Sequence, residues 1–537
     1  MPKHTSHDHP ELAILPQPVS ITRGEGYFPL TQETVIVTDQ QTQEVGTLLA
    51  EALAPALGFT PGVLTGAPSD LPAITLAIDP ELSHLGSEGY ELTVTPQQVD
   101  LRAAHPAGVF YATQTLRQLL PTDIFSATPV SREWTIPAVT IKDEPRFQWR
   151  GYMLDSARHF IPKRSIFKFI DLLALHKMNM LHLHLTDDQG WRVEIKKYPR
   201  LTEVGSQRKE TVVGHAHVSQ EYDGTAHGGF YSQDDLREMV AYATARSITI
   251  VPEIDLPGHA QAAIAAYPEL GVLGEPVEVA TTWGIHPYLY NTRETTFQFL
   301  KDVLSEVMAI FPSRYIHVGG DEARKDQWQA SQEIQTHIKE LGLHDEDELQ
   351  SWFLSQIGAF LTQNGRLLLG WDEILEGGLP AGATVMSWRG IEGGIAAAQA
   401  GHDVVMTPTT HVYLDYYQSN DPSEPLAIGG YLPLQKVYTF DPIPDVLTAE
   451  QAQHVLGAQC NLWTEYVPTP EHLEYMTFPR AIALSELTWT PKEQLDFADF
   501  RARLALHEAR LTNLAVKFRP VAKLDQEQTF PERPSIW

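Results

Sequence analysis

From residue 145 onward the chain repeats one pattern, in which a short apolar run, a polar loop and a stretch of helical spacing follow one another. The apolar runs that we expect to be strands are residues 147–155, 179–186, 248–255, 315–320, 366–371, 383–388, 403–407 and 455–460. Helical spacing is clear between them, for example in Phe297, Leu300, Leu304 and Val307. This rhythm predicts one closed (β/α)8 TIM barrel rather than several open sheets.

The chain before residue 145 follows a different pattern. Alternating apolar and polar residues, broken by Pro and Gly, mark expected strands at residues 34–37, 73–77 and 90–94, and helical spacing follows over 107–120. These elements predict a smaller α+β domain ahead of the barrel. The expected division is the α+β domain at 1–145, the barrel at 146–505, and a C-terminal helix and tail packed on the barrel at 506–537.

Two local signals refine the barrel. Ser232 to Asp235 is typical of a capped helix start, ahead of the third expected strand. Residues 206–231 are rich in Gly and His and show no periodicity, so we expect a long loop near the rim. Loops of that length are usually functional or disordered, and this one is a candidate for covering a bound substrate.

Composition limits the partners and the compartment. The net charge is −29, from 68 acidic and 39 basic residues, and such a field repels nucleic acid and anionic membranes, so we expect neither as a partner. Cys460 is the single cysteine, which excludes a disulfide within the chain. The first ten residues lack the apolar core of a secretion signal, and no later stretch is long enough to span a bilayer. We therefore expect a cytoplasmic protein and leave open a homodimer.

Two adjacent carboxylates follow the fourth expected strand, in the segment HVGGDE at residues 317–322. Neighbouring residues in extended backbone point apart, so Asp321 and Glu322 can address two different atoms of one ligand. The glycine pair allows a ligand to approach the backbone closely. Because barrel enzymes keep their chemistry at the carboxyl ends of the strands, this pair is a better catalytic candidate than an ordinary surface acid pair.

Other polar residues reach the same rim. The second expected strand delivers Asp187, and the third delivers Asp255 and His259. His182 and His184 share one face at a spacing of two and, with His259, could be interpreted as a metal site. No glutamate or cysteine completes a recognisable ligand spacing, so we expect no metal or other cofactor, and core histidines satisfied by carboxylates instead.

Three tryptophans, Trp371, Trp388 and Trp463, lie at or near strand ends. A barrel interior is normally filled by Val, Ile and Leu, so a binding role at the rim explains these rings better than packing. Asp415 and Glu465 lie close to them in the expected strand order. Flat apolar faces beside charged acceptors match the C–H faces and hydroxyls of a sugar.

Five segments resemble the β-N-acetylhexosaminidases of glycoside hydrolase family 20. They are RGYMLDSARHF at 150–160, HLTDD at 184–188, DLPGH at 255–259, HVGGDE at 317–322 and WTEY at 463–466. They occur in the family's order over residues 146–500, and residues 1–145 are similar to the α+β domain that precedes its barrel. The resemblance implies exo-removal of a terminal β-linked N-acetylglucosamine or N-acetylgalactosamine from an oligosaccharide or glycoconjugate, with retention of configuration.

The resemblance also implies a role for each candidate residue. The nucleophile is the substrate's own acetamido oxygen, and Glu322 is the general acid and then the base. Asp321 stays charged and holds the acetamido N–H, while Tyr413 donates to the carbonyl oxygen. By the same resemblance, the walls of the acetamide pocket and of the sugar face are Trp371, Trp388 and Trp463. The residues that bind the C3, C4 and C6 hydroxyls are Arg150, Asp415 and Glu465. The residues that position the acid are His259, Asp187 and Asp255.

Two alternatives remain open. A conventional retaining glycosidase would use Glu465 or Glu373 as a covalent nucleophile and would accept sugars without an acetamide. A non-catalytic sugar-binding barrel would keep the aromatic box without the Asp321 and Glu322 pair. One departure from the family also appears, because residues 416–440 contain no Trp that could stack on the leaving group.

Overall fold

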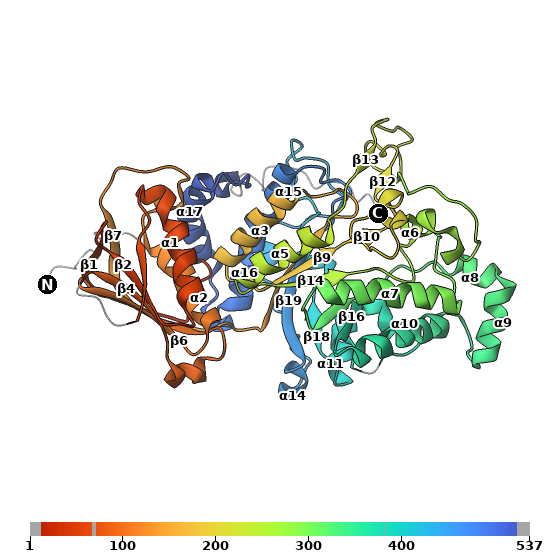
Figure 1. Cartoon of the computed structure of the whole chain (residues 1–537), viewed down its shortest axis with the longest axis horizontal. Coiled ribbons are helices and arrows are strands. Elements are labelled where there is room, and N and C mark those ends of the chain that lie inside the picture. The colour runs from red at the N-terminus through yellow and green to blue at the C-terminus, as the bar shows by residue number, and fades with distance from the viewer. Residues whose placement is uncertain (1–11, 67–70, 381, 524–537) are drawn as a thin grey trace.

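The N-terminal part of the computed structural model is a mixed sheet of seven strands (Figure 1). The structure describes residues 12–66, 71–380 and 382–523. The strand order is β1 (Ser20–Leu30), β7 (Trp134–Asp143), β5 (Tyr90–Val94), β6 (Gln98–Ala103), β4 (Ala73–Ile78), β2 (Val35–Thr38) and β3 (Gly62–Thr65). Helices α1 (Gln43–Leu57) and α2 (Pro106–Leu119) lie on the side of this sheet that faces the rest of the molecule, so they form the junction with the second domain.

The second domain is a closed barrel of eight parallel strands. In chain order they are β8 (Trp149–Asp155), β9 (Met180–His184), β14 (Thr249–Glu253), β15 (Tyr315–His317), β16 (Leu367–Trp371), β17 (Thr384–Ser387), β18 (Val404–Met406) and β19 (Val455–Leu462). The main outer helices are α3 (Lys163–Leu175), α5 (Gln233–Thr244), α7 (Glu294–Ile310), α10 (Glu346–Gln363), α11 (Glu392–Gln399) and α16 (Arg480–Trp489). Every residue of β8 and of β19 is buried, as expected for parallel strands covered on both faces.

Shorter elements occupy the connections. The strands are β10 (Thr186–Asp187), β11 (Gly190–Trp191), β12 (Gln207–Arg208) and β13 (His227–Gly228). The helices are α4 (Arg200–Glu203), α6 (Gln261–Ala266), α8 (Asp326–Ala330), α9 (Gln332–Leu341), α12 (Thr409–Val412), α13 (Leu434–Tyr438), α14 (Ala449–Ala452) and α15 (Pro470–Thr477). Most of them lie in connections that follow the carboxyl ends of barrel strands, where they can shape a site.

The eight barrel strands expected from the sequence are confirmed, with boundaries that differ by a few residues. The helix expected at 107–120 is α2, and Ser232 and Asp235 form a reciprocal capping box at the start of α5. In the first domain, the sequence expectation missed four strands, β1, β3, β6 and β7. Strand β1 is exposed at nine of its eleven positions and contains two glycines, so it lacks the apolar alternation that marks a half-buried strand.

The C-terminal helix differs from the expectation. Helix α17 (Phe497–Asn513) runs through the expected boundary between residues 505 and 506. Arg510 donates hydrogen bonds of 2.7 Å to the carbonyl oxygens of Ala13 and Gln118, which belong to the first domain. The helix therefore packs at the junction of the two domains and not on the barrel alone (Figure 1).

Two expectations for the termini concern residues outside the described ranges. These are the absence of a secretion signal in the first ten residues and the packing of the C-terminal tail beyond residue 523. Among the helices within the described ranges, none combines the length and the apolar character needed to cross a membrane.

Candidate active site

A cavity of about 400 Å³ opens at the carboxyl ends of the barrel strands. Eight of the twelve residues expected at the site line it: Asp321, Glu322, Trp371, Trp388, Tyr413, Asp415, Trp463 and Glu465. They come from the ends of β15, β16, β17 and β19 and from the segment that follows β18. The barrel closure therefore brings together residues that are almost 150 positions apart in the chain, as the sequence predicts.

The Asp321 and Glu322 pair lies on a tightly constrained turn after β15. Gly319 and Gly320 have φ angles of 64° and 94°, and a Cβ atom at Gly319 would overlap Asp255 Oδ1. Glu322 itself has a φ of 48°, which is unusual for a residue with a side chain. Glycine is thus required at position 319, and the strained turn fixes where the two carboxylates point.

His259 connects the carboxylate pair to the two aspartates that follow the carboxyl end of β9. Its Nδ1 lies 3.1 Å from Asp187 Oδ1 and 3.0 Å from Asp188 Oδ2. Its Nε2 lies 3.5 Å from Glu322 Oε2 and 3.6 Å from Asp321 Oδ2. Burial alone would lower the pKa of His259, but Asp187 and Asp188 raise it well above its ordinary value, so the imidazolium can face carboxylates on both sides.

The two acids expected to position Glu322 have different surroundings. Burial alone would raise the pKa of Asp187, yet Arg158 and His259 hold it well below its ordinary value. Asp255 accepts a long hydrogen bond of 3.4 Å from the Gly320 N–H, and burial followed by the nearby Asp321 raises its pKa well above the usual range. Asp187 therefore acts as a charged partner of His259, whereas Asp255 supports the turn.

Asp321 is 7% exposed, and this burial has the largest effect on its pKa. Burial raises the pKa of Asp321 to about 7 against the opposing effect of His259, and Glu322 adds to the rise. The expectation of a permanently charged Asp321 therefore applies only above about pH 7. An acetamido N–H donating to this carboxylate would favour the charged form.

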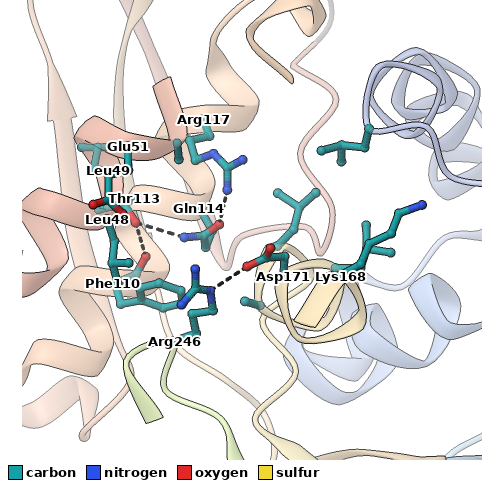
Figure 2. A pocket seen from close by; sticks show the side chains of 15 residues that line it. Leu48, Leu49, Glu51, Phe110, Thr113, Gln114, Arg117, Lys168, Asp171 and Arg246 are labelled. Atoms are coloured by element: carbon teal, nitrogen blue, oxygen red, sulfur yellow. Dashed lines mark hydrogen bonds and ion pairs between the residues drawn. The ribbon is translucent and has the colours of Figure 1, made fainter. Parts of the chain in front are cut away.

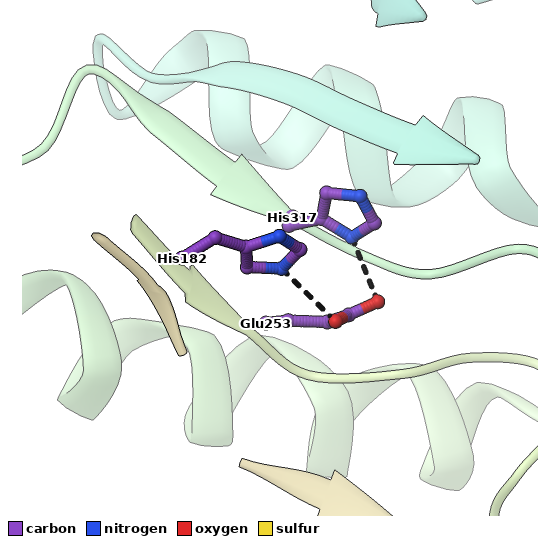
Figure 3. A group of neighbouring side chains, drawn as sticks. All are labelled: His182, Glu253 and His317. Atoms are coloured by element: carbon purple, nitrogen blue, oxygen red, sulfur yellow. Dashed lines mark ion pairs between the residues drawn. The ribbon is translucent and has the colours of Figure 1, made fainter. Parts of the chain in front are cut away.

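Beneath the pair, Glu253 contacts three buried histidines. Its Oε2 lies 3.0 Å from His182 Nε2 and 2.5 Å from His184 Nδ1, and its Oε1 lies 2.9 Å from His317 Nδ1. Figure 3 shows the His182 and His317 rings turned toward the same carboxylate. Trp371 Nε1 also donates to Oε1, at 2.9 Å.

This cluster is one of four groups in the described residues whose potential metal-ligand atoms lie within 4.8 Å of one another. Both oxygens of Glu253 already accept hydrogen bonds, and the second nitrogen of His184 lies 2.7 Å from Asp187 Oδ2. The set is therefore largely paired internally, although His317 Nε2 is buried without a hydrogen-bond partner among the described residues. It is explained as an ion-paired core, in line with the sequence interpretation of these histidines.

The aromatic residues form walls around the cavity. The rings of Trp371 and Trp463 are 5.8 Å apart at 46°, and those of Trp388 and Tyr413 are stacked with 6.2 Å between centroids. Trp388 is held in place by its Nε1, which donates to Glu373 Oε2 at 2.8 Å. Burial and the nearby Asp415 raise the pKa of Tyr413 well above its ordinary value, so its hydroxyl remains a donor.

The structure corrects the placement of Arg150. This residue is the second of β8, at the end of the barrel opposite the cavity, and it is fully buried. Its guanidinium contacts both carboxylate oxygens of Glu88, at 2.8 and 2.9 Å, and donates to the carbonyl oxygen of Lys177 at 2.7 Å. Because Glu88 belongs to the first domain, Arg150 ties the two domains together and does not reach a ligand at the rim.

Arg158 occupies the position that had been expected for Arg150. It follows the carboxyl end of β8 and lines the cavity. Its Nη2 lies 2.8 Å from Asp187 Oδ2, and its Nη1 lies 3.8 Å from Glu465 Oε1. The guanidinium carbon lies 4.9 Å from the centre of the Trp463 ring. Arg158 thus connects Asp187, the Trp463 ring and Glu465.

Comparison with known proteins agrees with this geometry. The family model described as glycosyl hydrolase family 20, catalytic domain, matches residues 147–492, and the model for domain 2 of the same family matches residues 11–144. The chain belongs to glycosyl hydrolase family 20. A curated relative, the beta-hexosaminidase of Porphyromonas gingivalis, is 45% identical over 494 residues, which cover 91% of this chain and 62% of the relative.

Two solved family 20 structures share the fold over most of their length. The GH20 beta-N-acetylhexosaminidase of Streptomyces coelicolor A3(2) has a TM-score of 0.82 and 32% identity, covering 95% of this chain and 98% of that one. The GH20 exo beta-N-acetylglucosaminidase of Vibrio harveyi, solved in complex with N-acetylglucosamine, has a TM-score of 0.84 and 32% identity, covering 97% of this chain and 81% of that one.

Within this family 20 barrel, the cavity presents acceptors that the protein does not satisfy. Asp321 Oδ1, Asp415 Oδ1 and Glu465 Oε2 are buried and have no hydrogen-bond partner among the described residues. Burial raises the pKa of Asp415 well above the ordinary range, and Glu465 contributes to the rise. Buried polar atoms are rarely left unpaired, so these oxygens are suited to a ligand that supplies several N–H and O–H donors.

Further cavity residues were missed from the sequence. Trp283 and Tyr416 come from irregular segments, and His217 comes from the loop at 206–231. Ala216 of the same loop donates its N–H to the Tyr466 hydroxyl at 3.2 Å, which connects the loop to the segment after β19. The contribution of this loop to the rim agrees with the expected covering role, although no sequence signal marks which of its residues contact the cavity.

Proposed function

We propose that this protein is an exo-acting, retaining β-N-acetylhexosaminidase that uses its substrate's acetamide as the nucleophile. The observation that carries the proposal is that Asp321, Glu322 and Tyr413 line one cavity whose walls include three tryptophans, Trp371, Trp388 and Trp463. An acetamide has an N–H, a carbonyl oxygen and a methyl group. Asp321, Tyr413 and the indole rings are suited to these three parts in turn.

In the first step the acetamido carbonyl oxygen attacks the anomeric carbon, and the bond to the glycosidic oxygen breaks. Glu322 protonates the leaving oxygen, while Asp321 accepts from the acetamido N–H and stabilises the positive oxazolinium that forms. In the second step the Glu322 carboxylate takes a proton from water, and the water oxygen attacks the anomeric carbon. The bond from that carbon to the acetamido oxygen breaks, which opens the oxazolinium ring and restores the acetamide. Two displacements at the same carbon retain its configuration.

The conventional alternative receives less support. Burial and then Asp321 raise the pKa of Glu373 to about 9, and its Oε2 accepts from Trp388, so it is a poor nucleophile at neutral pH. Glu465 lies beside Arg158, and burial raises its pKa as well. These surroundings make Glu465 better suited to accept hydrogen bonds from sugar hydroxyls than to act as a covalent nucleophile.

We infer exo action from the end of the cavity where Arg158, Asp415 and Glu465 meet. Charged groups that bind the hydroxyls of one sugar leave no room for a further sugar beyond it. The substrate is therefore the terminal N-acetylglucosamine or N-acetylgalactosamine of an oligosaccharide or glycoconjugate. The complex of the Vibrio harveyi enzyme with N-acetylglucosamine is consistent with this substrate class. The single, fully buried Cys460 thiol is compatible with the cytoplasmic location that we also propose.

The test is a matched pair of aryl glycosides, 4-nitrophenyl β-N-acetylglucosaminide and 4-nitrophenyl β-glucoside. We expect kcat/KM to be at least about 10³-fold higher for the acetamido sugar, because the nucleophile and its contacts disappear together in the glucoside. Comparable values for the two substrates would refute the proposal and would favour a carboxylate nucleophile.

A further inference from the structure

A second cavity, of about 290 Å³, lies between the two domains, far in the fold from the barrel rim. Helices α1 and α2 of the first domain form one side, and α3 of the barrel forms the other. Figure 2 shows polar side chains from both sides around this space. Its volume is just below the range of about 300–1,000 Å³ that is usual for sites of drug-sized ligands, so it suits a smaller molecule.

Arg117 of α2 is the unusual residue of this cavity. No carboxylate within the described ranges lies within ion-pair distance of it, and its Nε is buried without a hydrogen-bond partner. Its Nη1 donates to Gln114 Oε1 at 2.9 Å, and its guanidinium carbon lies 4.9 Å from the centre of the Phe125 ring. Burial lowers the pKa of Arg117 to about 10, which still leaves it charged at neutral pH.

The other cations of the cavity are already paired, and its remaining charged residue, Glu51 of α1, is exposed to solvent. Arg246 Nε lies 2.6 Å from Asp171 Oδ1, and its guanidinium carbon lies 3.4 Å from the centre of the Tyr242 ring. Lys168 Nζ contacts Glu474 at 2.5 Å. Among the three cations that line the cavity, Arg117 is therefore the one with no carboxylate at ion-pair distance within the described residues. Arg117 is partly buried, and a charge that is partly removed from water without a counter-ion is unfavourable, so an added anion would lower that cost.

Most of the remaining lining is hydrocarbon. Leu48 and Leu49 of α1, Phe110 of α2 and Leu172 and Leu175 of α3 contribute it. An inorganic anion would satisfy Arg117 but would leave this surface uncovered. We propose that the cavity between the domains is a binding site for a small amphipathic monocarboxylate, with its carboxylate on Arg117 and its apolar chain against the leucine side chains of α1 and α3.

Such a ligand would contact α2 and α3 at once, and it would therefore stabilise the association of the two domains. Ligand that binds only the folded protein raises the unfolding temperature in proportion to the logarithm of its concentration over Kd. The site is independent of the proposed hydrolysis, because none of its residues lines the cavity at the barrel rim.

The probe is hexanoate, measured by titration calorimetry and by thermal unfolding at pH 7 and constant ionic strength. We expect one site per chain and a concentration-dependent rise in unfolding temperature. Neutral hexanamide, which keeps the chain, and acetate and phosphate, which keep the charge, should each bind at least about tenfold more weakly. Phosphate binding as tightly as hexanoate would indicate a simple anion site and overturn the proposal, as would no detectable binding of hexanoate at 10 mM, a limit of roughly −3 kcal/mol.

Two variants locate the ligand. Arg117→Met removes the charge and keeps much of the volume, so it should fold and should lose at least about tenfold in hexanoate affinity. Ala52→Leu keeps Arg117 but fills space in the lining, and it should also weaken binding. The matched control is Arg132→Met, which removes an exposed arginine paired with Asp123 and should bind hexanoate like the unmodified protein. Unchanged affinity in either cavity variant would refute this location.

Discussion

Replacing Arg158 by Met should lower kcat/KM sharply without unfolding the protein. Arg158 Nη2 contacts Asp187 Oδ2 at 2.8 Å, and the two side chains are 8% and 0% exposed. Removing one partner of a buried pair typically costs about 3–5 kcal/mol, and we expect the lower end here because His184 and His259 still contact Asp187. Part of that cost falls on folding.

The part of this free-energy cost that affects catalysis can be estimated from the groups that Arg158 contacts. It lies beside Glu465 at 3.8 Å and over the Trp463 ring, so its loss should disturb both the proposed hydroxyl contacts and the aromatic wall of the cavity. A loss of about 3–4 kcal/mol in transition-state binding corresponds to about 10²–10³-fold in kcat/KM. Arg158→Lys should recover only part of it, because an ammonium cannot contact two acids in one plane.

The assay is hydrolysis of 4-nitrophenyl β-N-acetylglucosaminide, with thermal unfolding of each variant in parallel. Arg150→Met is the matched control, since Arg150 is also buried and lies in the strand that Arg158 follows, but contacts Glu88 at the domain junction. It should lower the unfolding temperature and leave kcat/KM of the folded enzyme within a few-fold. The reasoning fails if folded Arg158→Met is fully active, or if the two variants lose the same activity at the same stability.

Three further outcomes follow from the site. Glu322→Gln should slow substrates with poor leaving groups far more than activated aryl glycosides, whereas Asp321→Asn should slow both; equal leaving-group dependence in the two variants would contradict their roles. The pKa of Asp321, about 7, predicts that kcat/KM falls as pH drops through about 7, because the ionised form is lost there; this acid limb should disappear in Asp321→Asn, and its persistence would assign it to another group. Glu253→Gln weakens the support of Trp371, which it contacts at 2.9 Å, so it should raise KM for the acetamido sugar in a protein that still folds; an unchanged KM would show that the indole is held by packing alone.

The barrel was predictable because its strands are buried on both faces and therefore form continuous apolar runs between helical stretches. Asp321 and Glu322 were predictable because they follow such a strand directly. The error at Arg150 arose within a correctly recognised segment. Arg150 lies near the start of the strand and Arg158 follows its end, so the rule that barrel sites lie at the carboxyl ends already favours Arg158.

Other features depend on contacts that a single sequence does not display. Asp188 shares His259 Nδ1 with Asp187, which could not be inferred from two adjacent aspartates. The contact between Ala216 and Tyr466 joins residues 250 positions apart. The sheet of the first domain was underestimated because its edge strand β1 is largely exposed and lacks an apolar face.

The most direct test of substrate-assisted catalysis changes the nucleophile on the substrate and leaves the protein intact. In 4-nitrophenyl β-glucosaminides that carry acetyl, fluoroacetyl, difluoroacetyl and trifluoroacetyl groups on nitrogen, each fluorine makes the carbonyl oxygen less nucleophilic with little change in size. If that oxygen attacks the anomeric carbon, kcat/KM should fall steeply and steadily along the series. A kcat/KM that stays constant across the four substrates would contradict the account and would mean that a group of the protein is the nucleophile.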